Sequence, residues 1–145
     1  MRIYVASSWR NDFQPAVVDR LRAQGHDVYD FKDSDGFSWR EVSDVDESDW
    51  DFTGWMNALD HPAAERGFAR DMSALATAHR CVMVLPCGRS AHLEAGYAIG
   101  QRIPTAILCP RYDGADLMVK MADLVTDSLA EVCDWIGPEV RRAST

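Results

Sequence analysis

A glutamate near the middle of the chain, Glu94, has the surroundings of a chemically active carboxylate. An apolar run at residues 81–85 is typical of a buried strand, and a turn at 86–90 with a glycine, an arginine and a serine leads into an expected helix over 91–101. The N–H groups of a helix N-terminus lack intrahelical partners and favour an anion. Glu94 lies about one turn into this helix, so its side chain points back towards that end. The pattern favours a nucleophilic carboxylate, and a solvated helix glutamate is the alternative.

The elements that would position this carboxylate follow one another as alternating strands and helices. Strands are expected at 2–6, 26–31, 81–85 and 105–109, and helices at 13–24, 62–79, 91–101, 117–121 and 124–135. Such alternation predicts an α/β fold in which helices cover both faces of a parallel sheet. We expect a single domain over residues 1–137 and a polar tail at 138–145.

The expected helix at 62–79 carries a second carboxylate, Asp71. Apolar side chains at Phe68, Met72, Leu75 and Ala76 are predicted to form its inner face, and Asp71 falls among them near the edge of the pocket. The first strand leads into a polar loop that contains Ser7, Trp9 and Arg10. Loops at this position hold ligands in α/β folds, but the glycine pattern of a dinucleotide site is absent from this loop.

Residues 32–62 form a long stretch that is rich in aspartate and contains Trp39, Trp50 and Trp55. Long irregular segments in compact domains are usually functional or disordered, and the tryptophans argue against disorder. We therefore expect a partly helical lid, in which Phe37 and Trp39 contact a planar ligand. Trp50 and Trp55 fit equally well as anchors between the lid and the core.

The overall composition excludes several classes of protein. The chain has 145 residues, of which 47% are hydrophobic and 26% charged, and its formal net charge is −8. Without a basic stripe, a nucleic-acid polymer is not an expected partner. No apolar run approaches the roughly 20 residues needed to cross a bilayer. The chain starts with a strand pattern rather than a signal peptide, so we expect a cytoplasmic protein. The spacing of its 4 cysteines matches no zinc or redox pair, and we expect neither a metal nor a cofactor.

Several segments together resemble the nucleoside 2-deoxyribosyltransferase family. They are residues 3–9, 65–71, 85–96 and 117–123, and the resemblance extends over about 2–136, with the His-Leu-Glu-Ala-Gly run its most specific part. The resemblance implies a flavodoxin-like, Rossmann-like α/β fold that assembles as a homodimer or higher homo-oligomer. It also implies transfer of 2-deoxyribose between nucleobases through a covalent intermediate, with nucleosides and free bases as the small-molecule partners.

The resemblance assigns roles to three residues. Glu94 matches the family nucleophile, Asp71 matches the aspartate that handles the base and its protons, and Tyr4 matches the tyrosine that hydrogen-bonds the nucleophile. Some members carry another aspartate six residues before the nucleophile, where this chain has Gly88. This departure leaves open both the acceptor base and the balance between transfer and hydrolysis.

Two alternatives to a deoxyribosyltransferase remain open. Serines, arginines and a helix N-terminus can hold a 5′-hydroxyl or a 5′-phosphate. The resemblance extends to the related nucleoside 5′-monophosphate N-hydrolases, which use a similar scaffold, and this makes a 2′-deoxynucleoside 5′-monophosphate N-hydrolase the runner-up. A non-catalytic nucleotide-sensing module is the other, although such a module needs no set of Glu94, Asp71 and Tyr4. The residues expected to bind substrate are Ser7, Trp9, Arg10, Phe37, Trp39, Gly88, Arg89, Ser90 and His92.

Overall fold

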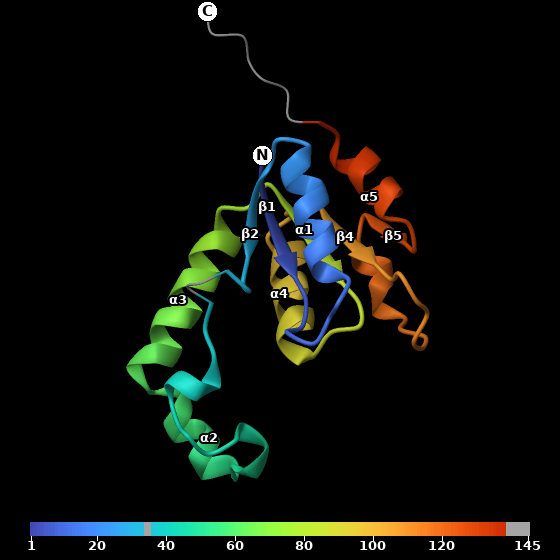
Figure 1. Ribbon diagram of the computed structural model, residues 1–145. Helices are drawn as coiled ribbons and strands as arrows, with labels where there is room; N and C mark the ends of the chain where they lie inside the picture. The colour runs from blue at the N-terminus through green and yellow to red at the C-terminus, as the bar shows by residue number, and fades with distance from the viewer. Residues whose placement is uncertain (34–35, 139–145) are drawn as a thin grey trace, which may run out of the picture.

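The centre of the molecule is a five-stranded parallel sheet (Figure 1). The structure is a computed structural model, and it describes residues 1–33 and 36–138. Its spatial order is β2-β1-β3-β4-β5, and every neighbouring pair is parallel. This is the flavodoxin-like order, in which the direction of winding reverses between β1 and β3. The predicted fold class is therefore confirmed. The strands are β1 (Arg2–Ala6), β2 (Asp27–Asp30), β3 (Arg80–Val84), β4 (Thr105–Leu108) and β5 (Leu124–Thr126).

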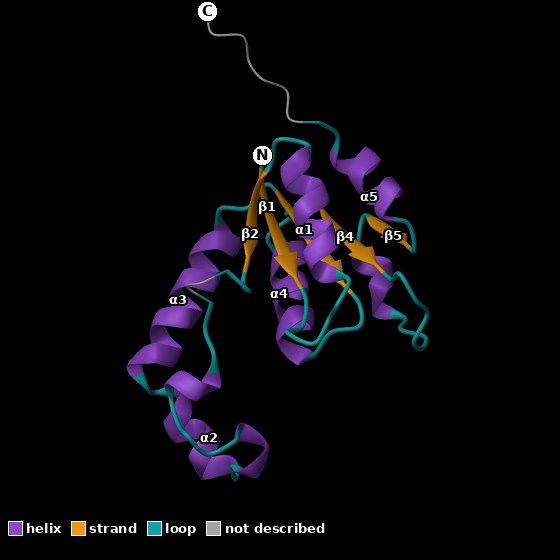
Figure 2. Ribbon diagram, viewed as in Figure 1, coloured by secondary structure: helices purple, strands orange, loops and turns teal. Residues whose placement is uncertain are grey.

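Helices lie on both faces of the sheet, as Figure 2 shows. One face is covered by α1 (Gln14–Ala23) and α5 (Leu129–Ile136), and the other by α3 (Pro62–Ala76) and α4 (Arg89–Gly100). Helix α1 ends where Gly25 adopts a φ of 92°, a left-handed conformation that favours glycine. A short 3₁₀ helix, η3 (Met118–Met121), lies before β5. No helix in the described ranges is long and apolar enough to span a membrane.

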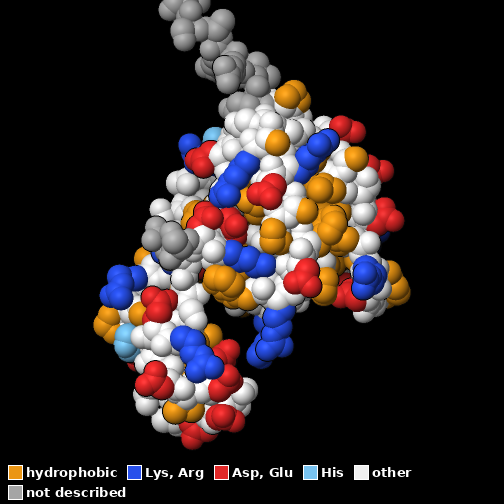
Figure 3. Space-filling view, viewed as in Figure 1, with side chains coloured by type: hydrophobic (Ala, Val, Ile, Leu, Met, Phe, Trp, Pro, Cys, Tyr) orange, Lys and Arg blue, Asp and Glu red, His pale blue; other side chains and the backbone are white. Residues whose placement is uncertain are grey.

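Residues 36–61, which we call the lid, project from the sheet beside α3 (Figure 1). The lid contains two 3₁₀ turns, η1 (Trp39–Glu41) and η2 (Glu47–Asp49), and the helix α2 (Phe52–Leu59). Ser38, Asp46 and Asp51 cap these three elements through side-chain oxygens that accept backbone N–H groups. Figure 3 shows a hollow between the lid and the rest of the domain, with acidic side chains gathered on the lid.

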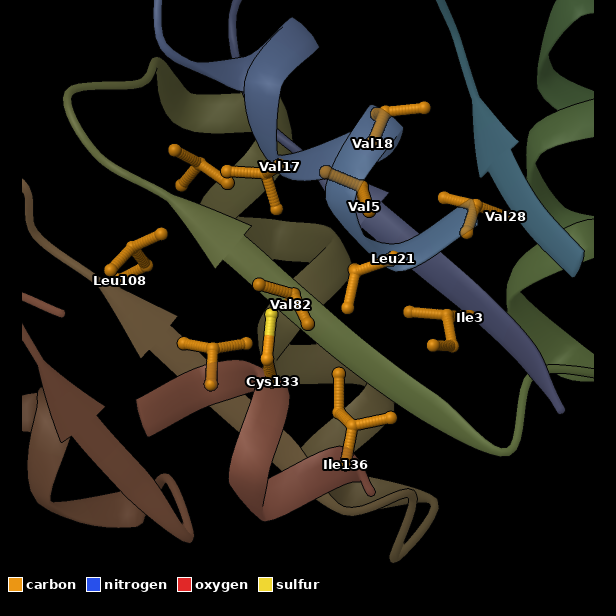
Figure 4. Packing of buried hydrophobic residues seen from close by; sticks show 12 residues of the cluster. Ile3, Val5, Val17, Val18, Leu21, Val28, Val82, Leu108, Cys133 and Ile136 are labelled. Atoms are coloured by element: carbon orange, nitrogen blue, oxygen red, sulfur yellow. The ribbon is translucent and has the colours of Figure 1, made fainter. Parts of the chain in front are cut away.

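The core on the α1/α5 face is built mainly from valine, leucine and isoleucine (Figure 4). Strand residues such as Val5 and Val82 are fully buried between the helical layers, as expected for a parallel sheet that is covered on both faces. On the opposite face small residues of α4, Ala91, Ala95 and Ala98, pack against the sheet. These alanines bring α4 close to β1 and β3, and so bring Glu94 close to the strand ends.

The structure corrects two details of the sequence-based prediction. Residues 124–126 form the edge strand β5 rather than the start of a helix, because they pair with β4 and Ser128 then caps α5 with its side chain. Phe68 and Ala76 were expected on the inner face of α3 but are exposed, Phe68 by 69%, since Ala63, Ala64, Gly67 and Leu75 face inwards instead. Most of the predicted polar tail at 138–145 lies outside the described residues.

Candidate active site

A cleft of about 960 Å³ opens at the carboxyl ends of β1 and β3. This is the point where the winding of the sheet reverses, and it is where doubly wound folds bind ligands. The loop after β1, the lid, α3 and the start of α4 all contribute to its walls. The lining residues are Ser7, Ser8, Trp9, Arg10, Phe31, Phe37, Ser38, Trp39, Arg40, Asp46, Glu47, Asp71, Gly88, Arg89, Ser90, Ala91 and Glu94.

Glu94 lies on the inner wall of the cleft and is hydrogen-bonded to Tyr4. Tyr4 belongs to β1 and is only 1% exposed, so its hydroxyl has a fixed position. Burial raises the pKa of Glu94 to about 7, and the negative charge of Asp71 adds to this effect. The hydrogen bond from Tyr4 acts in the opposite direction, because it stabilises the ionised carboxylate. Near neutral pH, Glu94 is therefore available as a carboxylate with a raised basicity.

Asp71 of α3 also lines the cleft, and a tyrosine of β2 holds its side chain. The hydroxyl of Tyr29 donates to Oδ1 of Asp71 at 2.5 Å, and the charge of Arg70 acts on the same carboxylate. Burial is the largest influence and raises the pKa of Asp71, while Tyr29 and Arg70 lower it. A carboxyl group at this position can exchange a proton with a ligand in the cleft.

The loops that carry these groups are fixed by buried polar side chains. Ser7 donates to the carbonyl oxygen of Val84 at 2.8 Å and so ties the end of β1 to the end of β3. Asn11 is 3% exposed and donates to the carbonyls of Val84 and Pro86 at 3.3 and 3.1 Å. Its side-chain oxygen also accepts two backbone N–H groups at the start of α1. Asn11 was not among the predicted site residues.

Aromatic side chains form the outer part of the cleft. Phe37 and Trp39 of the lid meet edge to face, with ring centroids 4.8 Å apart. Trp39 makes a second edge contact with Trp50, which lies behind it and does not line the cleft. On the sheet side, Trp9 packs edge to face on Phe31, and both rings line the cleft. Two aromatic pairs on different walls are suited to hold a planar ring.

The mouth of the cleft carries positive charge at the start of α4. Arg10 and Arg89 both line the cleft, and neither forms an ion pair with another described residue. Gly88 is the N-cap of α4 and provides no side-chain cap, so the first N–H groups of the helix remain open to a ligand. Within the lid, Oδ2 of Asp46 lies 3.8 Å from Nη2 of Arg40, and both residues line the cleft.

His92 is the one predicted binding residue that does not line the cleft. It is exposed on α4, and its Nδ1 lies 2.8 Å from the carbonyl oxygen of Gly88 and 3.7 Å from Sγ of Cys87. The other predicted residues are brought together as lining residues, with Tyr4 directly behind Glu94. Tyr29, Phe31, Arg40, Asp46 and Glu47 are additions that the sequence did not single out.

The fold and this cleft define a flavodoxin-like α/β protein with two carboxylates in a cleft at the switch point of its sheet. No family model and no curated protein matches the sequence. Among solved structures, the chain is similar to a 2-deoxyribosyltransferase from Bacillus psychrosaccharolyticus, with a TM-score of 0.57 and 18% sequence identity. The match covers 91% of this chain and 90% of the chain of that enzyme. It is also similar to a conserved protein from Enterococcus faecalis V583, with a TM-score of 0.52, 16% identity, and coverage of 90% and 92%. At these identities the likeness is one of fold.

Proposed function

We propose that this protein cleaves the N-glycosidic bond of 2′-deoxynucleosides and transfers 2-deoxyribose to another nucleobase. The observation that carries the proposal is the pair of carboxylates Glu94 and Asp71, which both line the cleft, interact electrostatically and are each hydrogen-bonded by a tyrosine. The fold shared with a 2-deoxyribosyltransferase supports the same reaction class. The proposal thus rests on the chemistry of the site and on the architecture together.

In the first half-reaction, ionised Glu94 attacks C1′ of the sugar. A C–O bond forms, the C1′–N bond breaks, and its electron pair leaves with the base. Protonated Asp71 delivers a proton to the departing base, directly or through water, which makes the base a better leaving group. The product is a glycosyl ester on Glu94, as in the covalent intermediates of retaining glycosidases. Tyr4 orients the nucleophile through its hydrogen bond.

In the second half-reaction, a nitrogen of an incoming base attacks C1′ and Glu94 leaves as a carboxylate. The proton lost by the incoming base returns to Asp71, which restores the starting state. Water in place of the base would give free 2-deoxyribose, and the enzyme would then act as a hydrolase. Phe37, Trp39 and Trp9 line the outer part of the cleft with aromatic rings on which an acceptor base can stack, and this favours transfer.

The test is chromatography of base release and exchange from deoxyadenosine, deoxycytidine and deoxyinosine, with and without a second free base. New nucleoside that appears only with the acceptor base present is the expected result. Glu94→Ala should abolish turnover while ligand binding persists, and mass spectrometry of the wild type should detect a deoxyribosyl adduct on Glu94. Ligand binding without turnover on any nucleoside or nucleotide would instead indicate a nucleotide-sensing module.

A second candidate function is hydrolysis of 2′-deoxynucleoside 5′-monophosphates to free base and sugar phosphate. The observation that favours it is the positive charge of Arg10 and Arg89, which form no ion pair within the described residues and line the cleft together with Ser90 and the uncapped start of α4. Arginines at a helix N-terminus suit a phosphate group. Base release from monophosphates alone, lost in Arg89→Ala and without any exchange, would establish this function in place of transfer.

We also propose that the chain forms a homodimer or a higher homo-oligomer. Helices α3 and α4 and the turn η3 cover the same face of the sheet, and each exposes large apolar side chains. Phe68, Leu93 and Met118 are 69%, 75% and 58% exposed. Such clustered apolar exposure marks an interaction surface. Light scattering of the wild type and of Leu93→Glu tests this assignment, because the charge should dissociate the oligomer.

A further inference from the structure

We propose that Tyr29 is a positioning residue that holds Asp71 and couples it, through the ring of Tyr4, to the nucleophile Glu94. This inference rests on the proposed glycosyl-transfer function. Its structural basis is a continuous series of contacts: Glu94 to the Tyr4 hydroxyl, the Tyr4 ring to the Tyr29 ring, and the Tyr29 hydroxyl to Asp71.

The two tyrosines are matched by the register of the sheet. Tyr4 in β1 lies directly opposite Tyr29 in β2, so both side chains leave the same face of neighbouring strands. Their rings stack with centroids 5.2 Å apart and an interplanar angle of 16°. Each hydroxyl then contacts a carboxylate that is carried by a different helix, Glu94 on α4 and Asp71 on α3.

Neither tyrosine can change its role as a donor near neutral pH. Burial, followed by the nearby carboxylates, raises the pKa of Tyr4, and burial with the hydrogen bond to Asp71 raises that of Tyr29. Both phenols therefore remain protonated and donate to the carboxylates they touch. In this way the sheet fixes the relative positions of two groups that arrive from separate helices.

The charges around both carboxylates set the expected consequence of losing the Tyr29 hydroxyl. Asp71 faces Tyr29 on β2 and Arg70 on α3, and it interacts electrostatically with Tyr4 and Glu94. Without the donor, Asp71 holds its proton to a higher pH. With less negative charge on Asp71, Glu94 ionises at a lower pH, since the repulsion that raises its pKa is weaker.

A role in packing alone is the alternative, because Tyr29 also lies against the core cluster on this face of the sheet. Tyr29→Phe separates the two roles, since it keeps the stacked ring and removes only the hydroxyl. Tyr97→Phe is a matched control. Tyr97 packs against the same cluster and forms no side-chain hydrogen bond with another described residue.

The experiment compares pH profiles of kcat and KM for the wild type, Tyr29→Phe and Tyr97→Phe. In Tyr29→Phe we expect kcat to fall about 10-fold to 100-fold, with a smaller change in KM, because the proton donor is misplaced. The acid limb of the profile should move to lower pH and the alkaline limb to higher pH. An unchanged profile, or a rate loss without displaced limbs that parallels a loss of stability, would overturn the inference.

A second measurement does not depend on turnover. Carboxyl ¹³C NMR titration of labelled protein should show that the titration of Asp71 moves to higher pH in Tyr29→Phe and stays in place in Tyr97→Phe. If the wild type turned over no nucleoside, the proposed function would fail, and the NMR titration would still decide the link. A displaced Asp71 titration supports the link between Tyr29 and Asp71, and an unmoved one rejects it.

Discussion

Gly67 of α3 lies directly against Phe37 of the lid, with no room for a side chain between them. A Cβ atom at Gly67 would lie 2.7 Å from Cβ and 2.9 Å from Cγ of Phe37. Gly67 and Asp71 are one turn apart and therefore share a face of α3. The lid thus rests on α3 immediately beside the proposed general acid, and the missing side chain at Gly67 sets how closely it approaches.

Gly67→Ala should displace the lid. The added methyl group meets the root of the Phe37 side chain, which cannot rotate away, and overpacking of this kind costs about 1–3 kcal/mol. The gain in helix propensity is at most about 1 kcal/mol, so we expect net destabilisation. Because Phe37 and Trp39 line the cleft, KM for the nucleoside should rise with a smaller change in kcat. Urea denaturation and steady-state kinetics measure both effects.

Gly100→Ala is the matched control for this substitution. Gly100 also lies in a helix, α4, and a Cβ there would meet nothing within 4 Å. We expect unchanged kinetics and a stability gain of up to about 1 kcal/mol. Equal effects of the two substitutions would show that helix propensity, rather than the contact with the lid, explains the result at Gly67.

The pH dependence of the reaction should report the ionisation of Glu94. In the proposed mechanism the carboxylate form is the nucleophile, and burial raises the pKa of Glu94 to about 7, so kcat/KM should rise as the pH rises through about 7, before the loss of the Asp71 proton forms the alkaline limb. Tyr4→Phe removes a hydrogen bond that lowers this pKa, and the rising limb should then move to higher pH. If kcat/KM of the wild type already rose near pH 4, the result would contradict a buried nucleophile with a raised pKa.

The same residue should make stability depend on pH. The pKa of Glu94 is raised from 4.5 to about 7 in the folded protein, so its favourable contribution is full below pH 4.5 and is lost as the pH rises through 7. Glu94→Gln removes the buried charge and keeps an acceptor for Tyr4. After allowance for partial exposure, we expect the variant to be about 1–2 kcal/mol more stable than the wild type at pH 8. Urea denaturation at pH 5 and pH 8 checks this, since the two proteins should be nearly equal at pH 5.

The sequence was sufficient for those features that depend on local pattern. The apolar runs of β1, β3 and β4, and the strand, glycine turn and helix around Glu94, are each contained in a short stretch of chain. Strand β5 was missed because its three residues are too few to show a period and are fixed by pairing with β4. Phe68 was misplaced because an apolar residue near the edge of a helical stripe can face either way.

The missed site residues act through long-range contacts that no local pattern encodes. Tyr29 and Asp71 are 42 positions apart in the sequence, and Asn11 and Val84 are 73 apart. The first contact depends on the packing of α3 against the face of β2, and the second on the return of the chain to the same end of the sheet. Such partners can be named only after the topology is known.

Asn11 provides the last prediction, because it fixes the loops on both sides of the cleft. Its side chain is 3% exposed and forms four hydrogen bonds, one to the end of β3, one to the β3–α4 loop and two to the start of α1. Asn11→Ala removes all four hydrogen bonds, although the Val84 carbonyl keeps its bond from Ser7, and we expect a loss of about 2–4 kcal/mol in the free energy of unfolding. Ser7→Ala, which removes one bond to Val84, should cost about 1 kcal/mol. Urea denaturation ranks the two variants, and an Asn11→Ala protein as stable as the wild type would show that water replaces the lost contacts.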